Sequence, residues 1–108
     1  MKGTKAMLEI RPNCEMCDRD LPPDSPLARI CSYECTFCAD CVTQVLHDVC
    51  PNCAGGFVPR PIRPATARRA GVSRLHQISG TERRALKYDP ADIDALVAAA
   101  RDIPPADR

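Results

Sequence analysis

Residues 14–53 read CEMCDRDLPPDSPLARICSYECTFCADCVTQVLHDVCPNC and contain all eight cysteines of the 108-residue chain. Their spacing, C-x2-C-x13-C-x3-C-x2-C-x2-C-x8-C-x2-C, makes four close pairs. Zinc takes four thiolate ligands in a tetrahedron, with Zn–S distances of about 2.3 Å, so four pairs suffice for two ions. A full ligand set leaves no open coordination position, which is typical of structural zinc. We therefore predict two structural Zn²⁺ ions, held by Cys14, Cys17, Cys31, Cys35, Cys38, Cys41, Cys50 and Cys53.

The composition indicates that the fold needs either disulfides or metal. A cysteine-rich unit at residues 7–58 is too short to be stabilised well by a hydrophobic core alone. The chain has only two Tyr, two Phe and no Trp. We find no secretory signal before the cysteines and no apolar run as long as a membrane span. We therefore expect a cytoplasmic protein, because cysteine pairs in a reducing compartment bind metal more often than they form disulfides.

The spacing alone permits two arrangements of the ligands. In a sequential arrangement, the first four cysteines bind one ion and the last four bind the other. In an interleaved arrangement, the first and third pairs share one ion, and the second and fourth pairs share the other. In both, a C-x2-C turn directs backbone N–H groups toward its two sulfurs. Both arrangements remain open on spacing alone.

The order and the gaps of the cysteines resemble the RING finger pattern, with Cys35 at a position more often occupied by His. Met16 within the first pair, a helical segment after Cys41, and Pro51 within the last pair also match that pattern. The resemblance implies a small metal-stabilised α+β fold, either RING-like with a cross-brace or treble-clef-like, with short strands and one helix. The cross-brace implies the interleaved arrangement, with Cys14, Cys17, Cys38 and Cys41 at one ion and Cys31, Cys35, Cys50 and Cys53 at the other.

A second resemblance covers residues 7 to about 60 and includes residues other than cysteine. The segments MLEIRPNCE (7–15), LPPDS (21–25) and ICSYECTFCADC (30–41) are similar to a bacterial family of small cysteine-rich proteins that carries only a domain-of-unknown-function label. The resemblance implies no activity. It favours Met7 as the original start of translation, and it implies that the tail beyond Val58 is variable.

Short elements are predicted around the cysteines. Met7–Arg11 alternates apolar and charged side chains, as a strand does, and Val42, Val45 and Leu46 share one face at helical spacing. A loop with three prolines separates the first two cysteine pairs. The predicted elements are strands at 7–11, 28–30 and 57–58 and one helix at 42–47, within a two-zinc domain at 7–58 that follows an N-terminal extension at 1–6.

Charge divides the chain into three blocks. Residues 60–88 hold eight Lys/Arg and one Asp/Glu, whereas residues 1–59 and 89–108 are net acidic. We interpret residues 59–88 as a basic linker rich in proline and arginine. Residues 65–80 within it lack the large apolar groups that a packed core needs, so we expect a linker or a disordered arm there.

An amphipathic helix is predicted at residues 89–103, followed by a tail at 104–108. Asp89 is suited to be the N-cap, and Pro90 suits the first helical position. The apolar stripe consists of Ile93, Leu96, Val97 and Ala100. A helix of this length is marginal alone, so we expect it to dock on another part of the protein.

These observations favour a non-catalytic zinc-binding module that interacts with other proteins. The RING resemblance implies a partner surface at Met16, Val45 and Pro51. An alternative is nucleic-acid binding through residues 60–88, in which an arm containing Arg60, Arg63, Arg68, Arg69 and Arg74 neutralises phosphates. Less favoured alternatives are a RING-type ubiquitin-ligase-like adaptor and a zinc-storage or thiol-redox protein.

We do not expect an enzyme. The sequence holds no Ser/His/Asp set, no carboxylate pair in a defined element, and no phosphate-binding glycine loop. His47 and His76 are spare, because eight cysteines already complete two zinc sites. We predict neither a membrane partner nor a small-molecule substrate.

Overall fold

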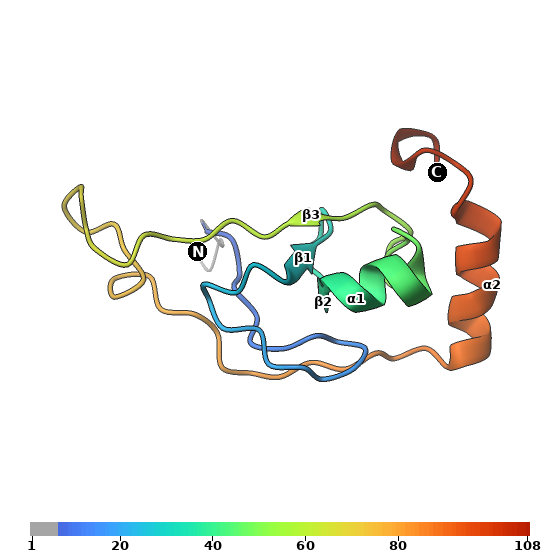
Figure 1. Ribbon diagram of the computed structural model, residues 1–108, viewed down its shortest axis with the longest axis horizontal. Helices are drawn as coiled ribbons and strands as arrows, with labels where there is room; N and C mark the ends of the chain where they lie inside the picture. The colour runs from blue at the N-terminus through green and yellow to red at the C-terminus, as the bar shows by residue number, and fades with distance from the viewer. Residues whose placement is uncertain (1–6) are drawn as a thin grey trace, which may run out of the picture.

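The computed structural model describes residues 7–108, so the extension at 1–6 and the choice of start site lie outside the described residues. The fold is a small α+β arrangement built on a three-stranded antiparallel sheet with strand order β2-β1-β3 (Figure 1). Ala28 pairs with Cys38 and Ile30 pairs with Val58. The strands are β1 (Ala28–Ile30), β2 (Thr36–Cys38) and β3 (Val58–Pro59).

A helical segment follows β2 without a break. It consists of α1 (Ala39–Cys41) and a short π-helix, η1 (Val42–Leu46), so the helix predicted at 42–47 begins earlier than expected. Cys38 explains the early start, because its Sγ accepts a hydrogen bond from the backbone N–H of Cys41 at 3.5 Å and caps the helix. The helix ends where His47 takes a left-handed conformation, with φ of 49°.

The strand predicted at residues 7–11 is wrong. Its backbone groups bind side chains and a distant loop instead of a neighbouring strand: Leu8 O accepts from Arg63, and Ile10 O accepts from the N–H of Gly80. The predicted strand at 28–30 is confirmed, and the last strand lies one residue later than predicted. β2 was missed, because its three residues, the last of them Cys38, show no clear alternation.

The hydrophobic core is small and lies between the sheet, α1 and the ligand turns. Phe37 and Phe57 meet edge to face, with ring centroids 5.4 Å apart. Leu21, Leu46 and Val49 are fully buried around them, together with several of the cysteines. A core with so few large side chains agrees with the expectation that most of the stability comes from metal.

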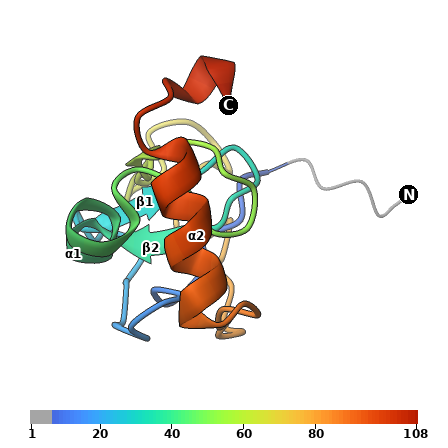
Figure 2. The same ribbon diagram turned by 90° about the vertical axis from the view of Figure 1, so that its right-hand side faces the viewer.

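The predicted C-terminal helix is present as α2 (Pro90–Ala100), which ends earlier than residue 103. Asp89 caps it by accepting a hydrogen bond from the N–H of Asp92 at 2.9 Å. Its apolar stripe packs across the end of the cysteine-rich unit, so Ile93 and Val97 are buried (Figure 2). A short 3-10 helix, η2 (Pro105–Asp107), follows it.

Arg108 fastens the C-terminal segment to the cysteine-rich unit. Its guanidinium donates hydrogen bonds to Asp48 O at 2.7 Å and Ala54 O at 3.1 Å. Pro105 lies so close to Gly56 that a Cβ at Gly56 would approach it to 2.9 Å. The segment after α2 therefore folds back over the last ligand turn.

Candidate metal centres

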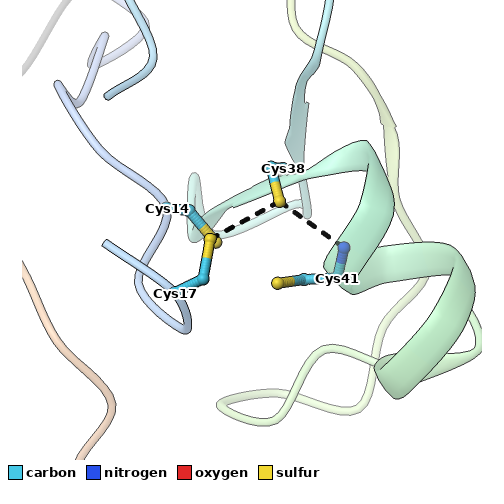
Figure 3. A group of neighbouring side chains, drawn as sticks. All are labelled: Cys14, Cys17, Cys38 and Cys41. Carbon is cyan, nitrogen blue, oxygen red and sulfur yellow. Dashed lines mark hydrogen bonds between the residues drawn. The ribbon is translucent and has the colours of Figure 1, made fainter. Parts of the chain in front are cut away.

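The first candidate centre contains Cys14, Cys17, Cys38 and Cys41, whose sulfur atoms all lie within 4.8 Å of one another. Cys14 and Cys17 approach from the N-terminal turn, while Cys38 and Cys41 approach from the end of β2 and from α1 (Figure 3). The sulfurs of Cys17 and Cys38 are 3.7 Å apart. Four thiols at this separation match the edges of a tetrahedron around one metal ion.

The second candidate centre contains the remaining four cysteines. The sulfurs of Cys31, Cys50 and Cys53 lie within 4.8 Å of one another, and the buried thiol of Cys35 lies against those of Cys31 and Cys50. The first and third pairs therefore form one group, and the second and fourth pairs form the other. The grouping is interleaved, and the sequential alternative is wrong.

The first ligand turn, Cys14 to Arg19, has a tight hydrogen-bonded form. The N–H of Cys14 donates to Arg19 O at 2.8 Å, and the N–H of Asp18 donates to Cys14 O at 2.9 Å. Asp18, directly after the second cysteine, has φ of 64°. Asp tolerates this left-handed conformation better than most residues other than glycine.

The last ligand turn, Cys50 to Gly55, repeats the same pattern. The N–H of Cys50 donates to Gly55 O at 2.8 Å, and the N–H of Ala54 donates to Cys50 O at 2.7 Å. Ala54 has φ of 66°. Each centre therefore receives one turn of this form, although the two turns lie at opposite ends of the cysteine-rich segment.

The other two pairs use different local structures. Cys38 and Cys41 lie at the start of a helix, as described above. Between Cys31 and Cys35 the longer x3 loop closes through the N–H of Glu34, which donates to Cys31 O at 3.1 Å. The N–H of Tyr33 points at Cys31 Sγ at 3.3 Å. Such N–H groups offset the negative charge of a thiolate.

Burial shifts the pKa of several of the cysteine thiols. It raises the pKa of Cys14, Cys41 and Cys50 above the usual range. Burial also acts to raise the pKa of Cys17, but hydrogen bonds from the Arg19 backbone N–H and from the Cys14 thiol outweigh it, so that pKa is lowered. Buried thiols with raised pKa values hold their protons until a metal ion displaces them.

A buried polar network links the two centres, and sequence reasoning missed it. Glu15 accepts hydrogen bonds from the Arg11 guanidinium at 3.0 Å, from the N–H of Thr36 at 2.7 Å, and from Asn52 Nδ2 at 3.2 Å. Glu15 and Asn52 both lie between the cysteines of a C-x2-C turn, one in each centre. A signal was available, because a carboxylate inside a ligand turn needs a partner when it is buried.

Asn13 forms a second polar contact that sequence reasoning missed. The fully buried Asn13 side chain donates to Arg84 O at 2.8 Å and accepts from the N–H of Arg84 at 3.1 Å. The N–H of Leu86 donates to Glu15 O at 3.1 Å. Residues 84–86 therefore lie along the first ligand turn, and this part of the chain is not a free linker.

The three predicted partner-surface residues do not form one open surface. Val45 is 44% exposed, whereas Met16 is partly buried against the core. Pro51 is buried and lines a cavity of about 440 Å³ between the last ligand turn and α2, together with Tyr88 and Leu96. The C-terminal helix therefore covers one part of the predicted surface.

The predicted nucleic-acid arm is divided in the structure. Arg60 is buried, and its guanidinium donates to the carbonyl oxygens of Arg11, Leu21 and Pro22. Arg63 donates to Leu8 O at 2.6 Å. The placement of Arg60 in the arm is thus wrong, because a guanidinium enclosed by backbone carbonyls cannot reach a phosphate.

The rest of the basic segment contains both paired and unpaired arginines. Arg83 forms ion pairs with Asp18 and Asp20, and Arg84 pairs with Glu9 at 3.0 Å. By contrast, no ion pair joins Arg68, Arg69 or Arg74 to another residue in the described range 7–108.

Neither histidine belongs to a cysteine group among residues 7–108. The ring of His76 is hydrogen-bonded to Ser73 Oγ at 2.9 Å, in a local turn. None of the helices within residues 7–108 has the length and apolar character that crossing a membrane requires.

Comparison with known proteins places the metal centres within a shared region. Residues 7–63 match the family model described as "Protein of unknown function (DUF1272)". The "Uncharacterized protein R02474" of Rhizobium meliloti (strain 1021) is 63% identical over 60 residues, which cover 56% of this chain and 71% of that protein. No solved structure matches the chain. All eight cysteines lie inside the region that the family model matches, and α2 lies outside it. The chain therefore belongs to the DUF1272 family.

Proposed function

We propose that this protein is a non-catalytic, two-zinc interaction module with a RING-like cross-brace, or treble-clef-like, fold. The interleaved grouping of four and four cysteines carries this proposal, because each metal ion would join two segments that are far apart in the chain. A module of this kind has no vacant ligand position and serves to hold surfaces in place.

Zinc is the metal that suits the two centres best. Four thiolates in a tetrahedron favour zinc or iron–sulfur chemistry. The turn geometry suits one ion in each centre. A cytoplasmic setting is part of the proposal, since reduced thiols are needed for ligation. The family match supports the assignment only in that all eight cysteines lie in the matched region. The description of the family names no activity.

A partner surface is available beside β1 and β3. A hollow of about 690 Å³ is lined by apolar groups that include Leu8, Tyr33 and Val58. Tyr33 is 71% exposed and Val58 is 59% exposed. Val58 also lies in β3, at the edge of the sheet, where an extended segment of a partner could add as a further strand. This surface is open, whereas Met16 is partly buried against the core and Pro51 is buried beside α2, so we prefer it to Met16, Val45 and Pro51.

Metal analysis of the purified chain tests the proposal first. We expect two zinc ions per chain. Cys38→Ser should release the ion held with Cys14 and Cys17, whereas Cys35→Ser should release the ion held with Cys50 and Cys53. A content well below two zinc ions would contradict the proposed centres. So would a Cys38→Ser variant that releases only the ion held with Cys50 and Cys53.

Affinity capture from cells of the native host tests the interaction role. The Tyr33→Ser/Val58→Ser double variant should lose any protein that the wild type retains, because both side chains line the hollow. Val45→Ser is the matched control, as Val45 is an exposed apolar residue outside the hollow. Equal capture by the wild type and the double variant, at equal zinc content, would exclude this surface.

A further inference from the structure

Residues 64–78 form a hydrogen-bonded loop at one end of the molecule, which we call the basic lobe (Figure 1). The N–H of Arg74 donates to Pro64 O at 2.9 Å and closes its base, and the N–H of Val72 donates to Arg69 O at 3.2 Å within it. The side chain of Gln77 donates to Gly71 O at 2.9 Å. These bonds give the segment a defined shape in place of the expected linker or disordered arm.

Ser73 organises the exposed turn of the basic lobe. It is 1% exposed, and its hydroxyl accepts a hydrogen bond from the N–H of Leu75 at 3.1 Å. Its carbonyl accepts from the N–H groups of His76 and Gln77. The turn therefore presents the side chain of Leu75 from a hydrogen-bonded backbone.

Two large aliphatic side chains project from this turn into solvent. Leu75 is 81% exposed and Ile78 is 82% exposed, more than any other large apolar side chain among residues 7–108. Val72, in the same lobe, is 50% exposed. Exposed apolar groups gathered at one site often mark a binding surface.

The charged side chains of the lobe itself have one sign. Arg68, Arg69 and Arg74 belong to the lobe, and residues 60–81 contain no Asp or Glu. The net-acidic segment 89–108 lies at the opposite end of the molecule (Figure 1). The molecule extends 46 Å along its longest axis, several times the screening length of about 8 Å at physiological salt. An anionic surface at the lobe would therefore not be repelled by the acidic end.

The combination of aliphatic and cationic side chains favours one class of ligand over another. Nucleic-acid binding draws on phosphate contacts and base stacking, and residues 60–81 contain no Phe, Tyr or Trp. An anionic lipid bilayer accepts both components, because aliphatic side chains enter its interfacial region while arginines pair with headgroups. The lobe lies at one end of the long axis, so a flat surface can meet it without touching the metal centres (Figure 1).

We propose that the basic lobe binds the surface of anionic lipid bilayers through Leu75, Ile78 and the arginines Arg68, Arg69 and Arg74. The association is peripheral and reversible, because two aliphatic side chains insert much less apolar surface than a membrane-spanning helix. It differs from the expectation that the protein has no membrane partner, which rested on the lack of a span. It is independent of the interaction role proposed above, since it uses a different surface.

Sedimentation of the full-length, zinc-loaded chain with vesicles tests this proposal. The chain should bind phosphatidylglycerol/phosphatidylcholine vesicles at least about tenfold more tightly than pure phosphatidylcholine vesicles, and high salt should weaken binding. Leu75→Ser/Ile78→Ser should lower the affinity about tenfold or more, and so should Arg68→Gln/Arg69→Gln. Val45→Ser and Arg101→Gln change exposed apolar and basic residues elsewhere, so they should leave the affinity unchanged.

Three results would overturn the proposal: no binding to anionic vesicles at low salt, full binding by Leu75→Ser/Ile78→Ser, or an equal loss of binding in the control variants. A competition with duplex DNA adds a fourth. If DNA binds the lobe with an affinity that Leu75→Ser/Ile78→Ser does not change, and displaces the vesicles, the lobe is a phosphate-binding arm. The zinc content of each variant confirms that the cysteine-rich unit is intact.

Discussion

Glu15 lies inside the first ligand turn, yet its carboxylate binds groups from three other parts of the chain. Arg11 precedes the turn, Thr36 belongs to β2, and Asn52 belongs to the last ligand turn. A buried carboxylate is tolerated only when it is paired, and here the pairing also holds the two metal centres in register. The residue therefore supports both centres without being a ligand.

We predict that Glu15→Gln lowers the free energy of unfolding of the zinc-loaded protein by about 2–4 kcal/mol. The amide removes the more deeply buried of the two carboxylates that pair with Arg11, leaving only Glu9, and it offers one acceptor oxygen in place of two. Urea unfolding followed by fluorescence or circular dichroism measures the change. Glu82→Gln is the control and should change the same quantity by less than about 0.5 kcal/mol, since Glu82 is exposed. Equal stability of the two variants would contradict a structural role for Glu15.

The thiol pKa values predict a direction for the pH dependence of metal binding. Burial raises the pKa of Cys41 and Cys50, so protons compete strongly with zinc for these ligands. The stabilisation by zinc is therefore present at neutral and alkaline pH and is lost as the pH falls. We expect a chromophoric zinc indicator to detect release of both ions between pH 7.5 and about pH 5. Retention of both ions throughout that range would contradict thiolate ligation.

At the scale of elements, α2 is held by its apolar stripe and by the residues that follow it. Ile93 and Val97 are buried against the cysteine-rich unit, and Arg108 binds two of its carbonyl oxygens. An eleven-residue helix is marginal in isolation, so these contacts decide whether it persists. The helix is thus a docked element outside the family-matched region, resting on a surface inside that region.

We predict that Ile93→Ala undocks α2 while leaving the metal centres intact. The lost burial costs about 2–4 kcal/mol, which should speed amide hydrogen exchange in α2 about thirtyfold or more. Zinc content should stay unchanged. Ala98→Ser, on the exposed face of the same helix, should have no such effect. If exchange accelerates equally in α2 and in β1, the helix and the cysteine-rich unit unfold together, and the prediction fails.

At the scale of the whole molecule, two interleaved metal ions would stabilise a fold that its core cannot. A structural zinc ion contributes about 10–16 kcal/mol apparent, and the net stability of a typical domain is only about 5–15 kcal/mol. Because the cysteine pairs of the two centres alternate along the chain, the loss of one ion also loosens the second. The metal content should therefore decide whether the cysteine-rich unit folds.

We predict that removing zinc with a strong chelator under reducing conditions unfolds the unit. Dispersed amide signals of β1, β2 and α1 should collapse in NMR spectra, and added zinc should restore them. Magnesium is the control and should restore nothing, because it does not bind thiolates. A metal-free chain that kept its dispersed spectrum would show that the core alone suffices.

Features governed by neighbouring residues could be predicted from the sequence. The eight candidate ligands follow from the close spacing of the four cysteine pairs, β1 lies where it was expected, and Asp89 and Pro90 begin α2 as their capping preferences require. The early start of α1 could not be read in this way, because it depends on a sulfur cap. The absence of a strand at 7–11 could not be read either, because the carbonyl oxygens of Leu8 and Ile10 bind residues more than fifty positions away.

The sequence by itself determined the ligand chemistry, the small number of core residues and the division of charge. Only the tertiary structure decided which cysteines group together, that α2 covers Pro51, and that Arg60 is buried while the basic lobe stays exposed. The physical reason is the separation along the chain of the residues that interact. Ligand type, capping and net charge depend on residues within a few positions of one another. Metal grouping, burial of a guanidinium and docking of a helix depend on which distant segments meet, and spacing alone leaves more than one solution.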